Sequence, residues 1–155
     1  MKWKIISLFV FAFCVLMVQA KDIELEPRIG VTSAATNRFD MGFHIGGMVS
    51  FGLSDRFAIQ PGVLMNVVET EDTYDNIGVA IPVYASWRVP LKKVNLRLNA
   101  GPYMEFKGGT NVGASLEAGV EYKQFYTGVA YFQDILSPRS VLLNLSFGYK
   151  FKVCK

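Results

Sequence analysis

One stretch of the sequence decides the fold: Val141-Leu142-Leu143-Asn144-Leu145-Ser146-Phe147-Gly148-Tyr149-Lys150-Phe151-Lys152-Val153. Every odd-numbered position is apolar, and from Asn144 onward every even-numbered position is small, polar or charged. Alternation with a period of two predicts a β-strand that has one apolar face. The stretch is also longer than the roughly 9–11 residues with which a tilted strand crosses a lipid bilayer.

The same period continues upstream to about residue 22, and no segment shows the i, i+3, i+4, i+7 pattern of an amphipathic helix. With turn residues as boundaries, we predict strands at 25–35, 39–51, 57–68, 78–89, 93–106, 111–123, 125–133 and 140–153. The predicted fold is all-β, an eight-stranded antiparallel up-and-down transmembrane β-barrel. Because Pro61, Pro82 and Pro102 fall inside strands that have no free edge, we expect β-bulges or bends there.

The first twenty residues differ from the rest. Lys2 and Lys4 precede an apolar run from Ile5 to Val18, and Val18-Gln19-Ala20 stands before the charged Lys21. This is the layout of a cleavable secretory signal. We therefore expect residues 1–20 to be a signal peptide and residues 21–155 to be one barrel domain. Cys154 is then the sole cysteine of the mature chain, which excludes an internal disulfide.

Charge and hydropathy exclude two classes of protein. The chain has 16 basic and 13 acidic side chains, and two of the lysines lie in the leader, so the electrostatic argument for nucleic-acid binding disappears. After the leader, no stretch approaches the run of about 18 apolar residues that a membrane helix requires, so a helical membrane protein is excluded.

Glycines and aromatic residues indicate which face of the barrel points outward. Ten of the 14 glycines fall on the polar face of the predicted strands, where the narrow interior of an eight-stranded barrel favours small residues. Aromatic residues on the apolar face gather near the short turns and predict a lipid-facing girdle. This girdle consists of Phe51, Phe57, Trp87, Tyr122, Phe125 and Phe151. A soluble, lipocalin-like periplasmic barrel that binds an apolar ligand would need the opposite face assignment, and it remains an alternative.

Charges of both signs fall on the polar face and would meet inside the barrel, where they must pair. The predicted lumen network consists of Arg88, Arg97, Glu105, Glu117, Glu121 and Lys150. Since eight strands leave no aqueous channel, we expect a closed lumen rather than a pore.

The connections alternate between segments that are generally longer or more polar and short turns, as in outer-membrane barrels. The longer ones span 32–38, 69–76, 107–110 and 134–139, and the shorter ones span 52–56, 90–92 and 123–124. With an even number of strands, both termini would lie on the short-turn side, in the periplasm. The connection Glu69 to Asn76 would face outward; its carboxylates lack the regular spacing of a calcium loop, so we predict a solvated tip and no metal site.

A catalytic site receives little support. His44 is the only histidine, and Ser50 lies on the same face of the same predicted strand, too far along it for a hydrogen bond. We expect His44 to form hydrogen bonds in the lumen, and we predict no catalytic residues and no cofactor. A lipid-modifying outer-membrane enzyme is the weaker alternative.

Ser146, Gly148, Phe151 and Val153 fit the polar-x-Gly-x-x-apolar-x-apolar pattern that resembles the assembly signal of outer-membrane barrels. The chain as a whole resembles the PorT-like outer-membrane β-barrel family over most of residues 28–153. The resemblance includes Arg28-Ile29-Gly30-Val31, Gly42 through Gly47, Leu53 through Pro61, Ile81-Pro82-Val83, Asn99 through Tyr103, Gly113 through Tyr122 and Phe147 through Phe151.

The resemblance implies an integral, non-catalytic protein of a Gram-negative outer membrane with a structural, loop-binding or secretion-accessory role. Its expected partners are outer-membrane lipid, the barrel-assembly machinery during biogenesis and an extracellular or secretion-system protein, with no nucleic acid.

Overall fold

The computed structural model describes residues 7, 11, 14–15, 18–35, 39–68, 77–135 and 141–154. Within these ranges the strands are β1 (Asp22–Ala35), β2 (Phe39–Gly52), β3 (Phe57–Val68), β4 (Ile77–Pro90), β5 (Asn95–Phe106), β6 (Thr110–Tyr122), β7 (Phe125–Asp134), β8 (Val141–Tyr149) and β9 (Phe151–Cys154). Among the described residues, no helix is both long and apolar enough to cross a membrane.

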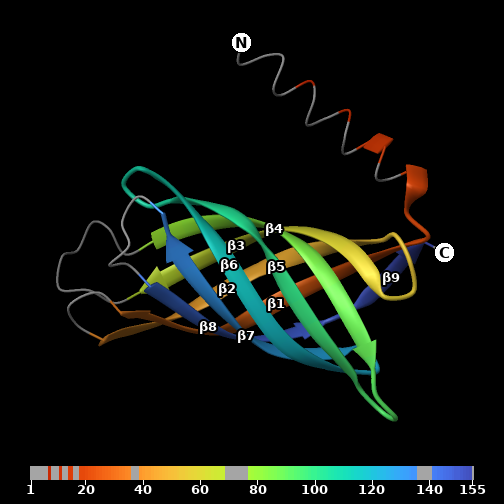
Figure 1. The fold of residues 1–155 in the computed structure, drawn as a ribbon. Helices are drawn as coiled ribbons and strands as arrows, with labels where there is room; N and C mark the ends of the chain where they lie inside the picture. The colour runs from red at the N-terminus through yellow and green to blue at the C-terminus, as the bar shows by residue number, and fades with distance from the viewer. Residues whose placement is uncertain are drawn as a thin grey trace.

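The strands form one closed antiparallel sheet. Each strand from β2 to β8 pairs with its successor, and β1 pairs with β2 on one side and with β8 and β9 on the other. The pairs Arg28 with Gly148 and Leu25 with Phe151 keep the same register, so β8 and β9 are two parts of one strand that is interrupted at Lys150. The described chain is therefore an eight-stranded up-and-down barrel, seen from the side in Figure 1.

The predicted strands match the observed ones closely. The strand predicted at 57–68 has the bounds of β3, and every other predicted boundary lies within three residues of the observed one. The two ends of the barrel differ. We call the end that carries the turns after β2, β4 and β6 the short-turn end, and the opposite end the long-connection end. The connection 69–76, with its predicted acidic tip, lies outside the described residues, as does the side chain of Cys154.

Alternating side chains give the wall of the barrel an apolar outside and a mostly polar inside, which also holds a buried apolar cluster of Leu64, Ala80, Tyr103, Ala130 and Phe132. Outward positions on the strands are mostly large and apolar, and many are more than 40% exposed, such as Ile29 at 58% and Leu116 at 62%. The ten glycines predicted to face inward all occupy the inward register of their strands. The buried polar and charged side chains are Glu24, Glu26, Arg28, Thr32, His44, Ser50, Gln60, Asn66, Ser86, Arg97, Asn99, Ser115, Glu117, Glu121, Asp134, Asn144, Ser146 and Lys150.

Of the bulges or bends predicted at the prolines, the bulges were wrong. The registers of β2–β3, β3–β4 and β4–β5 stay constant on both sides of Pro61, Pro82 and Pro102. Instead, each of these ladders omits two residue pairs near a proline, because proline has no N–H to donate. Among the described pairings, a register shift occurs between Ile23 and Glu24, where β1 meets β9.

Candidate functional site

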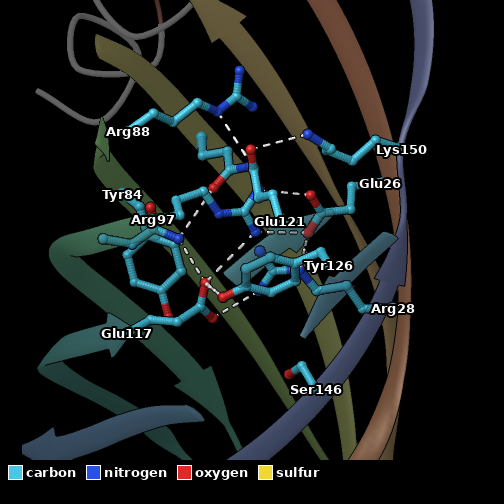
Figure 2. Close-up of polar contacts among 12 residues, drawn as sticks. Glu26, Arg28, Tyr84, Arg88, Arg97, Glu117, Glu121, Tyr126, Ser146 and Lys150 are labelled. Atoms are coloured by element: carbon cyan, nitrogen blue, oxygen red, sulfur yellow. Dashed lines mark hydrogen bonds and ion pairs between the residues drawn. The ribbon is translucent and has the colours of Figure 1, made fainter. Parts of the chain in front are cut away.

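A network of ion pairs fills the lumen toward the short-turn end (Figure 2). Among the described residues it joins four basic and four acidic side chains from β1, β4, β5, β6 and the break between β8 and β9, and their formal charges cancel. The members of this lumen network are Glu24, Glu26, Arg28, Arg88, Arg97, Glu117, Glu121 and Lys150.

Arg97 and Arg28 form the centre of the lumen network, and both side chains are fully buried. Arg97 donates from Nη1 and Nη2 to the two carboxylate oxygens of Glu26, at 2.7 and 2.9 Å. Arg28 donates from Nε to Glu26 Oε1 at 2.6 Å and from Nη1 to Glu117 Oε2 at 2.7 Å. Glu26 thus connects both guanidinium groups. Charge-assisted contacts of this kind offset the cost of removing the charges from water.

Tyr126 lies between the two arginines. Its ring centroid is 3.6 Å from Arg97 Cζ and 4.6 Å from Arg28 Cζ, and its hydroxyl donates to Glu117 at 2.7 Å. A Cβ added at Gly119 or at Gly128 would lie within 2.4 Å of the Tyr126 side chain. The Tyr126 ring can therefore lie against the wall because these two positions on neighbouring strands have no side chain.

The rest of the lumen network extends toward the short turns. Arg88 donates to Glu24 at 2.5 Å and lies 3.3 Å from Glu121, while Lys150 Nζ lies 3.0 Å from the other oxygen of Glu121. Five of the six predicted lumen charges are thus brought together. The sixth, Glu105, faces inward near the long-connection end of β5, where its register neighbours are Ala80 and Asn111, and it takes no part in these ion pairs.

Sequence reasoning missed three charged members of the lumen network. Glu24, Glu26 and Arg28 alternate with Leu25, Pro27 and Ile29, so the period of two already placed them on the inward face. The alternation could have identified these three residues. It could not have shown that their side chains meet Arg97 and Glu117 across the lumen.

His44 belongs to a second polar cluster, farther toward the long-connection end. Its Nδ1 lies 3.0 Å from Thr32 Oγ1, and its Nε2 lies 2.9 Å from Ser146 Oγ. Gly30 on β1 pairs with both His44 and Ser146, and a Cβ at Gly30 would lie 2.6 Å from the imidazole. The ring therefore crosses β1 above a glycine to reach β8. The expected lumen hydrogen-bonding role of His44 is confirmed by these contacts.

The aromatic residues predicted to form a girdle lie near the short-turn end, with one correction. Phe57, Trp87, Tyr122, Phe125 and Phe151 are 43–62% exposed. The rings of Phe57 and Trp87 stack with centroids 6.2 Å apart and planes at 7°.

Phe51 is only 1% exposed, so its assignment to the exposed girdle was wrong. Its direct cross-strand neighbours are Ile23 and Ile59, two half-buried apolar side chains that flank it on the same face of the sheet. By its register Phe51 therefore lies on the outward face, and its low exposure distinguishes it from the other five aromatic residues.

The four residues of the predicted assembly signal have two different environments. Ser146 is buried against His44, and Gly148 faces inward beside the Glu26 side chain. Phe151 and Val153 face outward and are 49% and 60% exposed. The inward pair contributes to the lumen, whereas the outward pair lies on the apolar surface near the short-turn end.

The start of the barrel is attached to the first short turn. The backbone N–H of Lys21 donates to the carbonyl of Gly52 at 2.7 Å, and Lys21 Nζ donates to Asp55 at 2.6 Å. This contact raises the pKa of Lys21 and lowers the pKa of Asp55. Both side chains are exposed, so the ion pair contributes little to stability. It does place the expected cleavage point, Ala20–Lys21, at the short-turn end.

Within the described ranges, no group of three or more His, Cys, Asp or Glu side chains is arranged to hold a metal ion. His44 and Ser146 form a hydrogen-bonded pair of the kind that nucleophilic catalysis uses, but both are at most 1% exposed. The contacts of both residues are those of a packed interior.

Inward charge, inward glycine and an apolar outside define the fold as a closed eight-stranded antiparallel barrel, the fold of small outer-membrane barrels. The chain is similar in structure to neisserial surface protein A, with a TM-score of 0.75 and 15% identity over 86% of this chain and 98% of that one. It is also similar to the N-terminal β-barrel domain of Pseudomonas aeruginosa OprF, with a TM-score of 0.58 and 14% identity over 85% and 98% of the two chains.

A third similar structure is that of Ail, the attachment invasion locus protein of Yersinia pestis, with a TM-score of 0.50 and 15% identity over 84% and 99% of the two chains. No protein-family profile matches the chain, and no curated protein sequence does. These likenesses concern the fold.

Proposed function

We propose that this chain is an integral outer-membrane barrel of a Gram-negative bacterium, with a closed lumen and no catalytic activity. The observation that carries the proposal is the inverted polarity of the wall. Fully buried arginines and glutamates lie inside, and exposed leucine, isoleucine, valine and phenylalanine side chains lie outside. Soluble monomers rarely expose contiguous apolar patches larger than a few hundred Å², whereas a lipid-facing band requires one all round the barrel.

The soluble, lipocalin-like alternative needs an apolar interior to hold its ligand. Many inward positions of the described strands instead carry ion pairs, amides, hydroxyls and glycines, and the inward apolar side chains Leu64, Ala80, Tyr103, Ala130 and Phe132 pack against one another in a buried cluster. We therefore favour the membrane barrel.

Cell fractionation followed by gel electrophoresis tests this proposal. In cells that express the full chain, we expect the protein in the outer-membrane fraction, and we expect its gel mobility to change when the SDS sample is boiled. Release by osmotic shock without detergent, with no change in mobility, would support the soluble barrel instead.

The proposed orientation places the short-turn end and both termini in the periplasm and the long connections outside the cell. The two longest connections, residues 69–76 and 135–140, both lie at the long-connection end, which supports this orientation. In a Cys154→Ser background, a membrane-impermeant maleimide should label Gly109→Cys on intact cells but not Ser54→Cys. Both positions are exposed, and a Cβ at Gly109 meets no atom within 4 Å. The reverse labelling pattern would invert the orientation.

The buried position of the candidate nucleophile supports a non-catalytic role. Ser146 is 1% exposed, and its partner His44 uses its other nitrogen to contact Thr32. A fluorophosphonate probe that labels active serines should leave the folded protein unlabelled. Labelling that disappears in Ser146→Ala would revive the lipid-modifying enzyme.

The biological role that we propose is structural or loop-mediated, with the long connections binding an extracellular or secretion-system partner. The resemblance to the PorT-like family, carried by the spacing of segments such as Asn99 through Tyr103, supports a secretion-accessory role. Cross-linking from Gly109→Cys on intact cells would test it, because a specific partner should be captured there and not from Ser54→Cys.

A further inference from the structure

The outer wall of the barrel contains an apolar groove, which we call the alanine groove. Its floor is formed by Ala85, Ala100 and Ala118 on the adjacent strands β4, β5 and β6. Larger side chains border it, with Phe57 and Trp87 toward the short-turn end and Leu116 on the other side. Ala85 pairs directly with Ala100, and Ala100 pairs with Leu116, so these outward side chains are immediate neighbours.

The groove is large enough for a ligand. The groove is open toward the outside of the barrel, and its volume of about 620 Å³ lies within the range of roughly 300–1,000 Å³ typical of small-molecule sites. The outward side chains that line the groove are apolar. At one end of the groove the rings of Phe57 and Trp87 are stacked, with their centroids 6.2 Å apart. The shape and lining fit a hydrocarbon chain that lies along the wall.

Positive charge lies beyond the aromatic border. The turn that joins β4 to β5 carries Lys92 and Lys93, and the turn before β3 carries Arg56; all three side chains are exposed. The backbone N–H of Arg88, near the end of β4, donates to the Arg56 carbonyl at 2.7 Å, which joins the turn before β3 to the last residues of β4. An anionic group at this end of the groove would therefore meet several cations.

The lysines lie about half a bilayer thickness from the groove. β4 ends at Pro90, five positions after Ala85, about 17 Å along the strand at roughly 3.3 Å per residue. With a strand tilt of about 45°, this corresponds to roughly 12 Å along the membrane normal, and Lys92 and Lys93 follow in the turn beyond, near the edge of the ~30 Å hydrocarbon core. When the groove floor lies near the middle of the bilayer, Lys92 and Lys93 reach the level of the headgroups.

We propose that the alanine groove binds one phospholipid with an anionic headgroup from the short-turn leaflet. An acyl chain occupies the groove between Trp87 and Leu116, and the headgroup phosphate lies beside Lys92 and Lys93. This inference rests on the proposed insertion of the barrel in a membrane. It goes further by assigning a site on one side of the wall and the charge class of its ligand.

A second copy of the chain is the less suitable occupant. Two copies in one membrane share their orientation, so a symmetric interface through this groove would place residues at equal depth opposite their counterparts. Lys92 and Lys93 of both copies would then approach each other, and their charges would repel. An anionic lipid would instead neutralise the same side chains.

The test is native mass spectrometry of protein purified in detergent from membranes of cells that express the full chain. The protein is mixed with equal amounts of palmitoyl-oleoyl phosphatidylglycerol and palmitoyl-oleoyl phosphatidylethanolamine. We expect one retained lipid per barrel, with phosphatidylglycerol preferred by about fivefold or more, as two lysines near a headgroup allow. Ala100→Phe should abolish retention by filling the groove, and Lys92→Gln with Lys93→Gln should remove the preference.

Matched variants elsewhere on the barrel provide the controls. Val31→Phe places a phenylalanine at an outward position on β1, opposite β5 in the barrel, and Lys123→Gln with Lys152→Gln removes two exposed lysines from other parts of the short-turn end. Neither should change retention. Equal retention of both lipids, or equal effects of test and control variants, overturns the lipid site. Every variant is first checked for the mobility change on boiling: if the unsubstituted protein lacks that change, the membrane barrel itself is wrong.

Discussion

Arg97 and Glu26 meet in the lumen through two parallel contacts, from Nη1 to Oε2 at 2.7 Å and from Nη2 to Oε1 at 2.9 Å. Glu26 also accepts from Arg28, so a single carboxylate holds two fully buried guanidinium groups. β1 and β5 lie on opposite sides of the barrel, and this pair spans the lumen between them. The barrel is therefore held together by ion pairs across its lumen as well as by the hydrogen bonds between neighbouring strands.

Removing that carboxylate should be costly. Glu26→Gln leaves Arg28 and Arg97 with less compensating negative charge in a buried site, and breaking a buried pair from one side costs about 3–5 kcal/mol. We expect a loss of that size in the free energy of unfolding, measured by urea titration of the barrel in lipid vesicles. Glu105→Gln, which changes an inward carboxylate outside the lumen network, is the control and should cost far less. Equal losses in the two variants would mean that the network does not brace the barrel.

Gly30 should be intolerant of any side chain. A Cβ there would lie 1.9 Å from the carbonyl oxygen of Leu145 and 2.6 Å from the His44 ring, so Gly30→Ala must move either the wall or the imidazole. We expect a destabilisation of about 1–3 kcal/mol, typical of overpacking. Gly47→Ala is the matched control, because a Cβ at that outward glycine meets its nearest atom at 3.8 Å. If both variants unfold at the same urea concentration, the packing of His44 over Gly30 is not a constraint.

The outward half of the assembly pattern should matter for biogenesis more than for the folded state. Phe151 and Val153 are exposed on the lipid side, so Phe151→Ser with Val153→Ser removes little packing inside the barrel. We expect a severalfold lower amount of heat-modifiable protein in outer membranes, with unchanged refolding of the purified chain in detergent. Phe147→Ser, an equally exposed aromatic on the same strand outside the pattern, should assemble normally. Equal assembly defects in the two variants would remove the assignment.

Local patterns predicted much of this molecule. A period of two is a local property, which is why the strand at 57–68 and the inward placement of the glycines follow from the sequence. Contacts between distant segments do not follow from it. His44 and Ser146 are 102 positions apart and meet only because both pair with Gly30, and Glu26 meets Arg97 across the lumen.

Two errors have the same origin. Phe51 has the parity of an outward residue and is still only 1% exposed, because parity gives the face of the sheet and not what covers the side chain. The prolines suggested bulges because a lost donor is visible in the sequence. Whether the ladder shifts or simply omits pairs depends on the strands beside it.

The depth of Trp87 in a bilayer tests the central claim most directly, namely that the apolar outside of the barrel faces lipid. In a Trp3→Phe background Trp87 is the sole tryptophan of the chain, and it is 43% exposed near the short-turn end. Lipids brominated near the headgroup should quench its fluorescence more than lipids brominated near the acyl terminus. When the tryptophan is moved by Trp87→Phe with Leu116→Trp, the order should reverse. Fluorescence that aqueous iodide quenches strongly and brominated lipids leave unchanged, at both positions, would contradict a lipid-facing wall.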